Sequence, residues 1–149
     1  MQQTTKDASL EVRRHIPAAI ERVYAAWTDQ AVAAKWAWGE QHDNIHVEID
    51  PQVGGVWRHT IRNRENGILW TFHGVYQELQ APTRVVFTFS WTSDRGDVEG
   101  QSLVRVDLAS RDGGTDVVIT HTRLDDAKVD GSRQGWESCL ASIRHALAQ

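Results

Sequence analysis

Between residues 44 and 124, apolar and polar residues alternate in a series of short segments that turns separate. Alternation with a period of two is the pattern of a β-strand that buries one face. Strands joined by short turns pair antiparallel, so the pattern predicts an antiparallel sheet with one apolar face. The segments predicted to be strands are residues 44–50, 56–63, 68–79, 84–91, 102–110 and 115–124, with residues 92–101 expected to form a long polar loop.

A sheet with one apolar face needs a cover, and the end of the chain supplies one. Trp136, Leu140, Ile143 and Leu147 recur at the spacing of one helical stripe, which predicts an amphipathic helix over residues 126–149. Earlier in the chain, the patterns predict a strand over residues 9–16 and short helices over residues 18–29 and 30–38. The order β-α-α-β6-α indicates an α+β fold, in which a curved antiparallel sheet of about seven strands wraps around the long C-terminal helix.

Composition bounds the classes of function. The 149 residues contain no repeat and no linker-like segment, so we expect one domain spanning residues 1–149. The net charge of −4 argues against nucleic-acid binding, which depends on clustered basic residues. No apolar run is long enough for a membrane helix or a signal core, and the single cysteine, Cys139, excludes an internal disulfide. These features lead us to expect a cytoplasmic protein without membrane insertion.

The segment "DPQVGGVW" raises the question of a phosphate-binding loop. Neither of the common glycine-rich phosphate motifs is present, and the segment leads from one predicted strand to another. Gly54 and Gly55 are therefore predicted to form a turn that needs a positive φ. Cys139 lies beside the apolar stripe of the last helix, where a small buried hydrophobic residue is expected rather than a nucleophile.

Histidines are the candidate polar residues of a site. His42 and His46 are four residues apart, which spans roughly 13 Å in a strand and is too far for one zinc ion, so no metal site is predicted. His59 and His121 share the apolar faces of their strands. They could be buried histidines satisfied by neighbours, polar groups of a ligand pocket, or acid–base catalysts. Of these roles, binding is favoured over catalysis.

Several segments together resemble a known family: "AIERVYAAWTDQAVAAKWAW", "EIDPQVGGVWRH", "GVYQELQAPTRVVFTFSW", "GGTDVVITHTRL" and "GWESCLASI". In order and spacing they are similar to the family related to the C-terminal domain of the activator of Hsp90 ATPase (AHSA1-like proteins). That family belongs to the START-like, Bet v 1-like (SRPBCC) superfamily. The resemblance implies a helix-grip fold with a cavity between the sheet and the C-terminal helix.

The resemblance also implies a function and a site. Members of the superfamily bind lipids, steroids, plant hormones or polyketides, and a few catalyse cyclisation or dehydration. We therefore expect a protein that binds a small hydrophobic or aromatic ligand without a cofactor. The residues expected to line the cavity are Trp36, Trp38, Trp57, His59, Ile61, Phe72, Tyr76, Phe87, Phe89, Trp91, Val106, His121, Trp136 and Leu140.

Two alternatives remain open at this point. One is an enzyme of the polyketide cyclase or dehydratase type that uses His59 or His121. The other is a protein-interaction module, with Hsp90 or with a second copy of the chain in a homodimer as the partner. The eukaryotic activator carries an additional N-terminal domain that makes much of the Hsp90 contact. This chain begins at its own first strand, so the link to Hsp90 is not carried over from the family name.

Overall fold

The computed structural model describes residues 7–36, 42–96 and 98–148, and for residues 98 and 99 it describes the backbone. The elements are β1 (Ala8–Ile16), α1 (Ile20–Thr28), α2 (Gln30–Ala33), β2 (His42–Ile49), β3 (Val56–Asn63), β4 (Leu69–Gln80), β5 (Arg84–Ser93), β6 (Val98–Arg111), β7 (Gly114–Leu124), the short 3₁₀ helix η1 (Asp126–Lys128) and α3 (Val129–Leu147).

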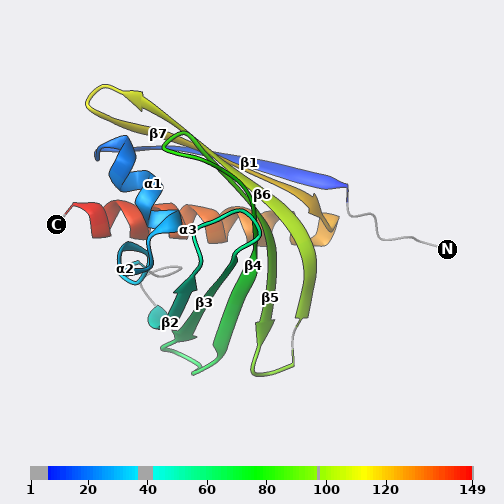
Figure 1. The fold of residues 1–149 in the computed structure, drawn as a ribbon. Helices are drawn as coiled ribbons and strands as arrows, with labels where there is room; N and C mark the ends of the chain where they lie inside the picture. The colour runs from blue at the N-terminus through cyan, green and yellow to red at the C-terminus, as the bar shows by residue number, and fades with distance from the viewer. Residues whose placement is uncertain (1–6, 37–41, 97, 149) are drawn as a thin grey trace.

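The seven strands form one antiparallel sheet in the order β1-β7-β6-β5-β4-β3-β2. The sheet curves around α3, and α1 and α2 pack at one end of the concave side (Figure 1). The predicted α+β helix-grip architecture is therefore confirmed. The predicted helical stripe is confirmed as well, since Trp136, Leu140, Ile143 and Leu147 are all buried against the sheet.

Two predicted element boundaries are wrong. Residues 92–101 do not form a long loop, because β5 continues to Ser93 and β6 already begins at Val98, with Thr92 paired to Val98. Gly96 adopts a φ of +89°, which lets the hairpin turn tightly. The second short helix ends at Ala33 instead of continuing to residue 38, and residues 37–41 lie outside the described part of the chain.

A β-bulge in β2 overturns the predicted alternation at Ile45. The register with β3 shifts between Asn44 and His46, so Ile45 is the extra residue and its side chain is 45% exposed. Asn44 points inward instead. Its amide nitrogen donates to the carbonyl oxygens of Ala34 at 2.8 Å and Trp36 at 2.5 Å. The bulge thus places a polar side chain where it caps the backbone that follows α2.

The two glycines of the β2–β3 turn serve different purposes. Gly54 has a φ of +87°, as the turn prediction required. Gly55 does not have a positive φ, but a Cβ atom there would lie 2.2 Å from the carbonyl oxygen of Asp50. One glycine therefore provides the backbone conformation and the other allows close backbone approach.

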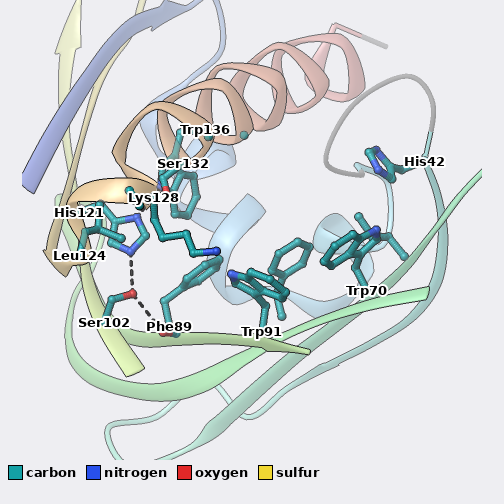
Figure 2. A pocket seen from close by; sticks show the side chains of 15 residues that line it. His42, Trp70, Phe89, Trp91, Ser102, His121, Leu124, Lys128, Ser132 and Trp136 are labelled. Carbon is teal, nitrogen blue, oxygen red and sulfur yellow. Dashed lines mark hydrogen bonds between the residues drawn. The ribbon is translucent and has the colours of Figure 1, made fainter. Parts of the chain in front are cut away.

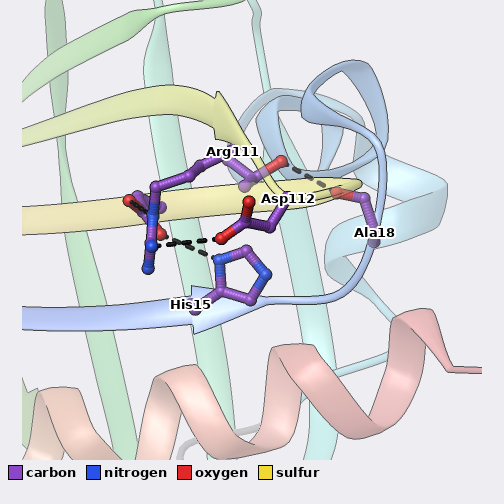
Figure 3. Close-up of polar contacts among 6 residues, drawn as sticks. His15, Ala18, Arg111 and Asp112 are labelled. Carbon is purple, nitrogen blue, oxygen red and sulfur yellow. Dashed lines mark hydrogen bonds and ion pairs between the residues drawn. The ribbon is translucent and has the colours of Figure 1, made fainter.

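Polar contacts fasten the end of β1 to the β6–β7 hairpin (Figure 3). His15 Nδ1 donates to Asp116 at 2.8 Å, and Arg111 Nε donates to the other oxygen of the same carboxylate at 2.5 Å. Both hydrogen bonds lower the pKa of the Asp116 carboxyl, and the one from Arg111 has the larger effect. The Thr115 hydroxyl also donates to the Ala18 carbonyl at 2.8 Å. These contacts tie the start of the chain to its last hairpin.

Within residues 7–36, 42–96 and 98–148, none of the helices is long and apolar enough to cross a membrane. No group of three or more His, Cys, Asp or Glu side chains is arranged to hold a metal ion in the same part of the chain.

Candidate functional site

A cavity of about 340 Å³ lies between the concave face of the sheet and the first half of α3 (Figure 2). Ala127, Lys128 and Gly131 in its wall are exposed, whereas His121 and Trp136 are buried. The mouth is therefore at η1 and the start of α3, and the cavity deepens toward His121. The wall consists of His42, Ile61, Trp70, Phe72, Phe89, Trp91, Ser102, His121, Leu124, Ala127, Lys128, Gly131, Ser132, Gly135 and Trp136.

Aromatic side chains from β4 and β5 form the floor of the cavity. Phe72 and Phe89 are stacked with ring centroids 5.6 Å apart and an interplanar angle of 20°. Trp70 and Trp91 meet edge to face, with centroids 5.1 Å apart. The strand registers place these rings side by side, because Phe72 pairs with Trp91 across β4 and β5. The floor thus offers flat apolar faces to a ligand.

Glycines keep the helical wall open. Gly131 and Gly135 are four residues apart on α3, and both line the cavity. Neither has a positive φ, and a Cβ atom added to either would meet nothing within 4 Å. Glycine inside a helix is less stable than alanine by roughly 0.5–1 kcal/mol, so neither backbone geometry nor packing explains these residues. What they contribute is volume next to the aromatic floor.

A chain of hydrogen bonds crosses the deep end of the cavity from α3 to the sheet. The Trp136 indole N–H donates to His121 Nδ1 at 2.9 Å. The His121 proton must then lie on Nε2, which donates to the Ser102 hydroxyl at 2.7 Å. The Ser102 hydroxyl donates in turn to the Phe89 carbonyl oxygen at 3.1 Å. This chain fixes one neutral tautomer of His121.

The surroundings of His121 favour its neutral form. Burial lowers its pKa to about 4. Both ring nitrogens are already engaged, one as an acceptor and one as a donor. In this arrangement neither nitrogen is available to take a proton from a ligand.

The mouth of the cavity carries a cation. The Lys128 ammonium lies 5.7 Å from the centroid of the Trp91 ring, a cation–π contact. Figure 2 shows the side chain reaching from η1 across the cavity toward Trp91. Among the side chains that the structure describes, no carboxylate lies within ion-pair distance of this ammonium.

The other end of the concave face, beneath α1 and α2, is filled. A void of only about 30 Å³ remains there, which is enough for water but far too small for an organic ligand. Trp27 and Trp36 pack into this end with ring centroids 5.7 Å apart. The Trp36 indole donates to the Ala26 carbonyl at 2.9 Å, and the Tyr76 hydroxyl donates to the Trp27 carbonyl at 2.6 Å. These rings act as core and tie α1 to the sheet.

His59 belongs to this filled end. Its Nε2 hydrogen-bonds to the Asn44 side-chain oxygen, and its ring meets Trp36 edge to face at 5.0 Å. Because both Asn44 amide hydrogens are donated to backbone carbonyls, the Asn44 oxygen is the acceptor and His59 the donor. Burial lowers the pKa of His59 to about 4. The structure therefore separates the two histidines that the sequence analysis grouped together.

The predicted cavity residues fall into four groups. Those in the wall of the 340 Å³ cavity are Ile61, Phe72, Phe89, Trp91, His121 and Trp136. Those around the 30 Å³ void are Trp36, Trp57, His59, Tyr76, Phe87 and, again, Trp136. Val106 and Leu140 are buried in the core and contribute to neither wall. Trp38 lies outside the described residues.

Sequence reasoning missed part of the wall. Trp70 and Ser102 follow from the alternation that identified Phe72 and Val106, because they lie two and four residues away on the same faces. Gly131 and Gly135 were visible as two glycines on the face of a predicted helix. His42 and Lys128 had no such signal, because their positions depend on where β2 and η1 come to lie.

Comparisons with known proteins agree with this architecture. A protein from Chromobacterium violaceum has a crystal structure similar to this one, with a TM-score of 0.82, 26% identity and coverage of 95% of this chain and 97% of its own. The solution structure of an AHSA1-like protein from Aeromonas hydrophila gives a TM-score of 0.75 at 26% identity, covering 95% and 92% of the two chains.

An AHSA1 protein from Silicibacter pomeroyi shares the fold, with a TM-score of 0.81 at 24% identity and coverage of 95% and 98%. A comparison with curated proteins finds no match. The model of the family described as activator of Hsp90 ATPase homolog 1-like proteins matches residues 17–148, nearly the whole chain. The chain therefore belongs to the activator of Hsp90 ATPase homolog 1-like family, as its sequence motifs indicated.

Proposed function

We propose that this protein binds a small, largely apolar or aromatic molecule in the cavity between the sheet and the first half of α3. The observation that carries the proposal is an aromatic-lined space of about 340 Å³ beside two helix glycines that nothing else explains. The volume lies within the range of roughly 300–1,000 Å³ that is typical of small-molecule sites. A flat ligand could stack on the Phe72–Phe89 floor while Gly131 and Gly135 leave room above it.

Binding is better supported than acid–base catalysis. His121 borders the cavity, but its two nitrogens are committed to Trp136 and Ser102. His59 lies in the wall of the small void beneath α2 and is bonded to Asn44. Neither histidine is therefore poised to exchange a proton with a molecule bound in the larger cavity.

The test is to fill the cavity from the helix side. N-phenyl-1-naphthylamine, a neutral dye that fluoresces in apolar sites, is expected to bind the wild-type protein. Gly135→Leu should abolish dye binding while the protein stays folded, because the new side chain extends into open space. Ala141→Leu is the matched control, since Ala141 is exposed on the same helix and lies outside the cavity wall.

Two results would contradict the proposal. One is a Gly135→Leu variant that binds the dye as tightly as the wild type. The other is a wild-type protein that binds neither this dye nor any member of a thermal-shift panel of aromatic and acyl compounds.

A further inference from the structure

The polar groups deep in the cavity are already used by one another. His121 donates its only N–H to Ser102, Ser102 donates its only O–H to the Phe89 carbonyl, and Trp136 donates its indole N–H to His121. A buried ligand atom that needed a donor from these three residues would have to break that chain. The deep end is therefore suited to the apolar part of a ligand.

The mouth is chemically different because of Lys128. Among the described residues of the wall, Lys128 is the only Lys, Arg, Asp or Glu. The neighbouring carboxylates of Asp125, Asp126 and Asp130 are not part of that wall. Lys128 is therefore the charged side chain that a bound molecule meets among the described residues of the wall.

The ammonium of Lys128 is also available to a ligand. It lies 5.7 Å from the centroid of the Trp91 ring, and among the side chains that the structure describes no carboxylate is within ion-pair distance of it. A flexible four-carbon stem allows it to move a short way toward an anion. Ser132, in the same wall, adds a hydroxyl that can donate a hydrogen bond.

We propose that the ligand is an amphipathic anion, with an apolar aromatic or aliphatic body in the deep end and one carboxylate or similar anionic group held by Lys128 at the mouth. This inference rests on the proposed function and adds the charge and orientation of the ligand. The orientation follows from the two ends of the cavity, since among the described wall residues the cation, Lys128, lies at the mouth.

Two dyes with the same ring system test separately whether the cavity binds a ligand and whether it prefers an anionic one. 8-Anilinonaphthalene-1-sulfonate carries one negative charge, and N-phenyl-1-naphthylamine lacks the sulfonate. The wild-type protein is expected to bind the anionic dye more tightly than the neutral dye. Lys128→Gln should weaken binding of the anionic dye by roughly tenfold and leave the neutral dye unchanged, since a charge-assisted contact is lost. Lys128→Arg should retain binding of the anionic dye.

The control is Lys35→Gln, which makes the same charge change at an exposed lysine that is not in the wall. It should alter binding of neither dye, and Gly135→Leu should abolish binding of both. Displacement of the anionic dye by 2-naphthoate and by decanoate then distinguishes an aromatic from an aliphatic body. In each case the corresponding neutral alcohol should compete less well than the acid.

The dye experiments distinguish failure of the proposed function from failure of the anionic ligand. If neither dye binds, the proposed function fails. If both dyes bind equally well, or if Lys128→Gln changes both affinities or neither, binding in the cavity stands and the anionic ligand is overturned.

Discussion

Aromatic residues of the sheet line both ends of the concave face, but one end is filled and the other holds a cavity. Under α1 and α2, aromatic rings fill the space and leave about 30 Å³. Under the start of α3, an equally aromatic sheet borders about 340 Å³. The sheet does not make the difference. Trp27 of α1 and Trp36, which follows α2, fill one end, whereas the stretch of α3 that covers the other end includes Gly131 and Gly135.

This contrast shows that aromatic content alone does not predict a cavity. Aromatic side chains fill space as readily as they line it, and their large area makes them strong core residues. What leaves a space open is the absence of side chains on the element that covers them.

Trp136 separates the two ends, and removing it should have the largest effect. Its indole borders both spaces and packs against Trp27 at 6.0 Å and Phe89 at 5.5 Å. Trp136→Ala is expected to lower the free energy of unfolding by about 3–5 kcal/mol, because it creates a cavity and leaves His121 without its donor. Chemical denaturation would measure this loss. Trp91→Ala, at the half-buried mouth, should cost clearly less; equal losses would show that Trp136 does not divide the core.

Low pH should destabilise both ends through their histidines. Burial lowers the pKa of His59 and of His121 from 6.5 to about 4, so the unfolded chain binds more protons than the folded chain between these values. Stability is therefore lost as the pH falls from about 6.5 toward 4, by about 2 kcal/mol per histidine between pH 7 and pH 5.

Urea denaturation at the two pH values, on the wild type and on His59→Gln and His121→Gln, would measure this dependence. Each variant should lose about half of the pH-dependent change. His46→Gln is the control for the substitution itself, because His46 is exposed on β2 and lines neither the cavity nor the void. A wild-type stability that is flat over this range would disprove the neutral, buried state of the two imidazoles.

Asn44 holds the filled end together by polar contacts, and its loss should have an intermediate effect. Asn44→Ala removes the acceptor of His59 and the donor to two backbone carbonyls, at a cost of about 1–3 kcal/mol. Its neighbour provides the control. Ile45→Ala should change stability by no more than about 0.5 kcal/mol, since the bulge leaves Ile45 exposed. The reverse ranking of the two variants, measured by thermal unfolding, would contradict the bulge.

The smallest expected change in the free energy of unfolding is an increase instead of a loss. Gly135→Ala is expected to stabilise the protein by about 0.5–1 kcal/mol, because alanine favours a helix and the methyl group meets nothing. Ala141→Gly, at an exposed position of α3, should destabilise it by a similar amount. If Gly135→Ala were destabilising in thermal denaturation, the helical wall would be packed and the cavity smaller than described.

The sequence predicted the fold well because its signals are local and repeated. Alternation identified each strand, and the spacing from Trp136 to Leu147 identified the gripped helix. The errors lie where one residue changes the pattern or where partners are distant. A bulge at Ile45 cannot be recognised from alternation, because it interrupts that alternation by a single position.

The site was harder to predict than the fold. Every aromatic residue on an inward face was a reasonable cavity residue, and the sequence holds no information on which rings meet another helix. Trp57 and Phe87 illustrate this difficulty. Both are predicted to line the cavity, but they pack edge to face in the filled end, with ring centroids 5.1 Å apart. The hydrogen bonds of His121 depend on Ser102 and Trp136, which only the folded sheet and helix bring to the same place.

The pairing of β1 with β7 has a consequence for how the chain is made. Ile16 lies opposite Thr115, so the first strand finds its partner only after most of the chain has left the ribosome. The helix that the sheet grips, at residues 129–147, is synthesised after all seven strands. Until then the aromatic concave face has nothing to cover it. The pairing of β1 with β7 and the docking of α3 therefore come late, and a nascent chain whose concave face is still uncovered is expected to be prone to aggregate.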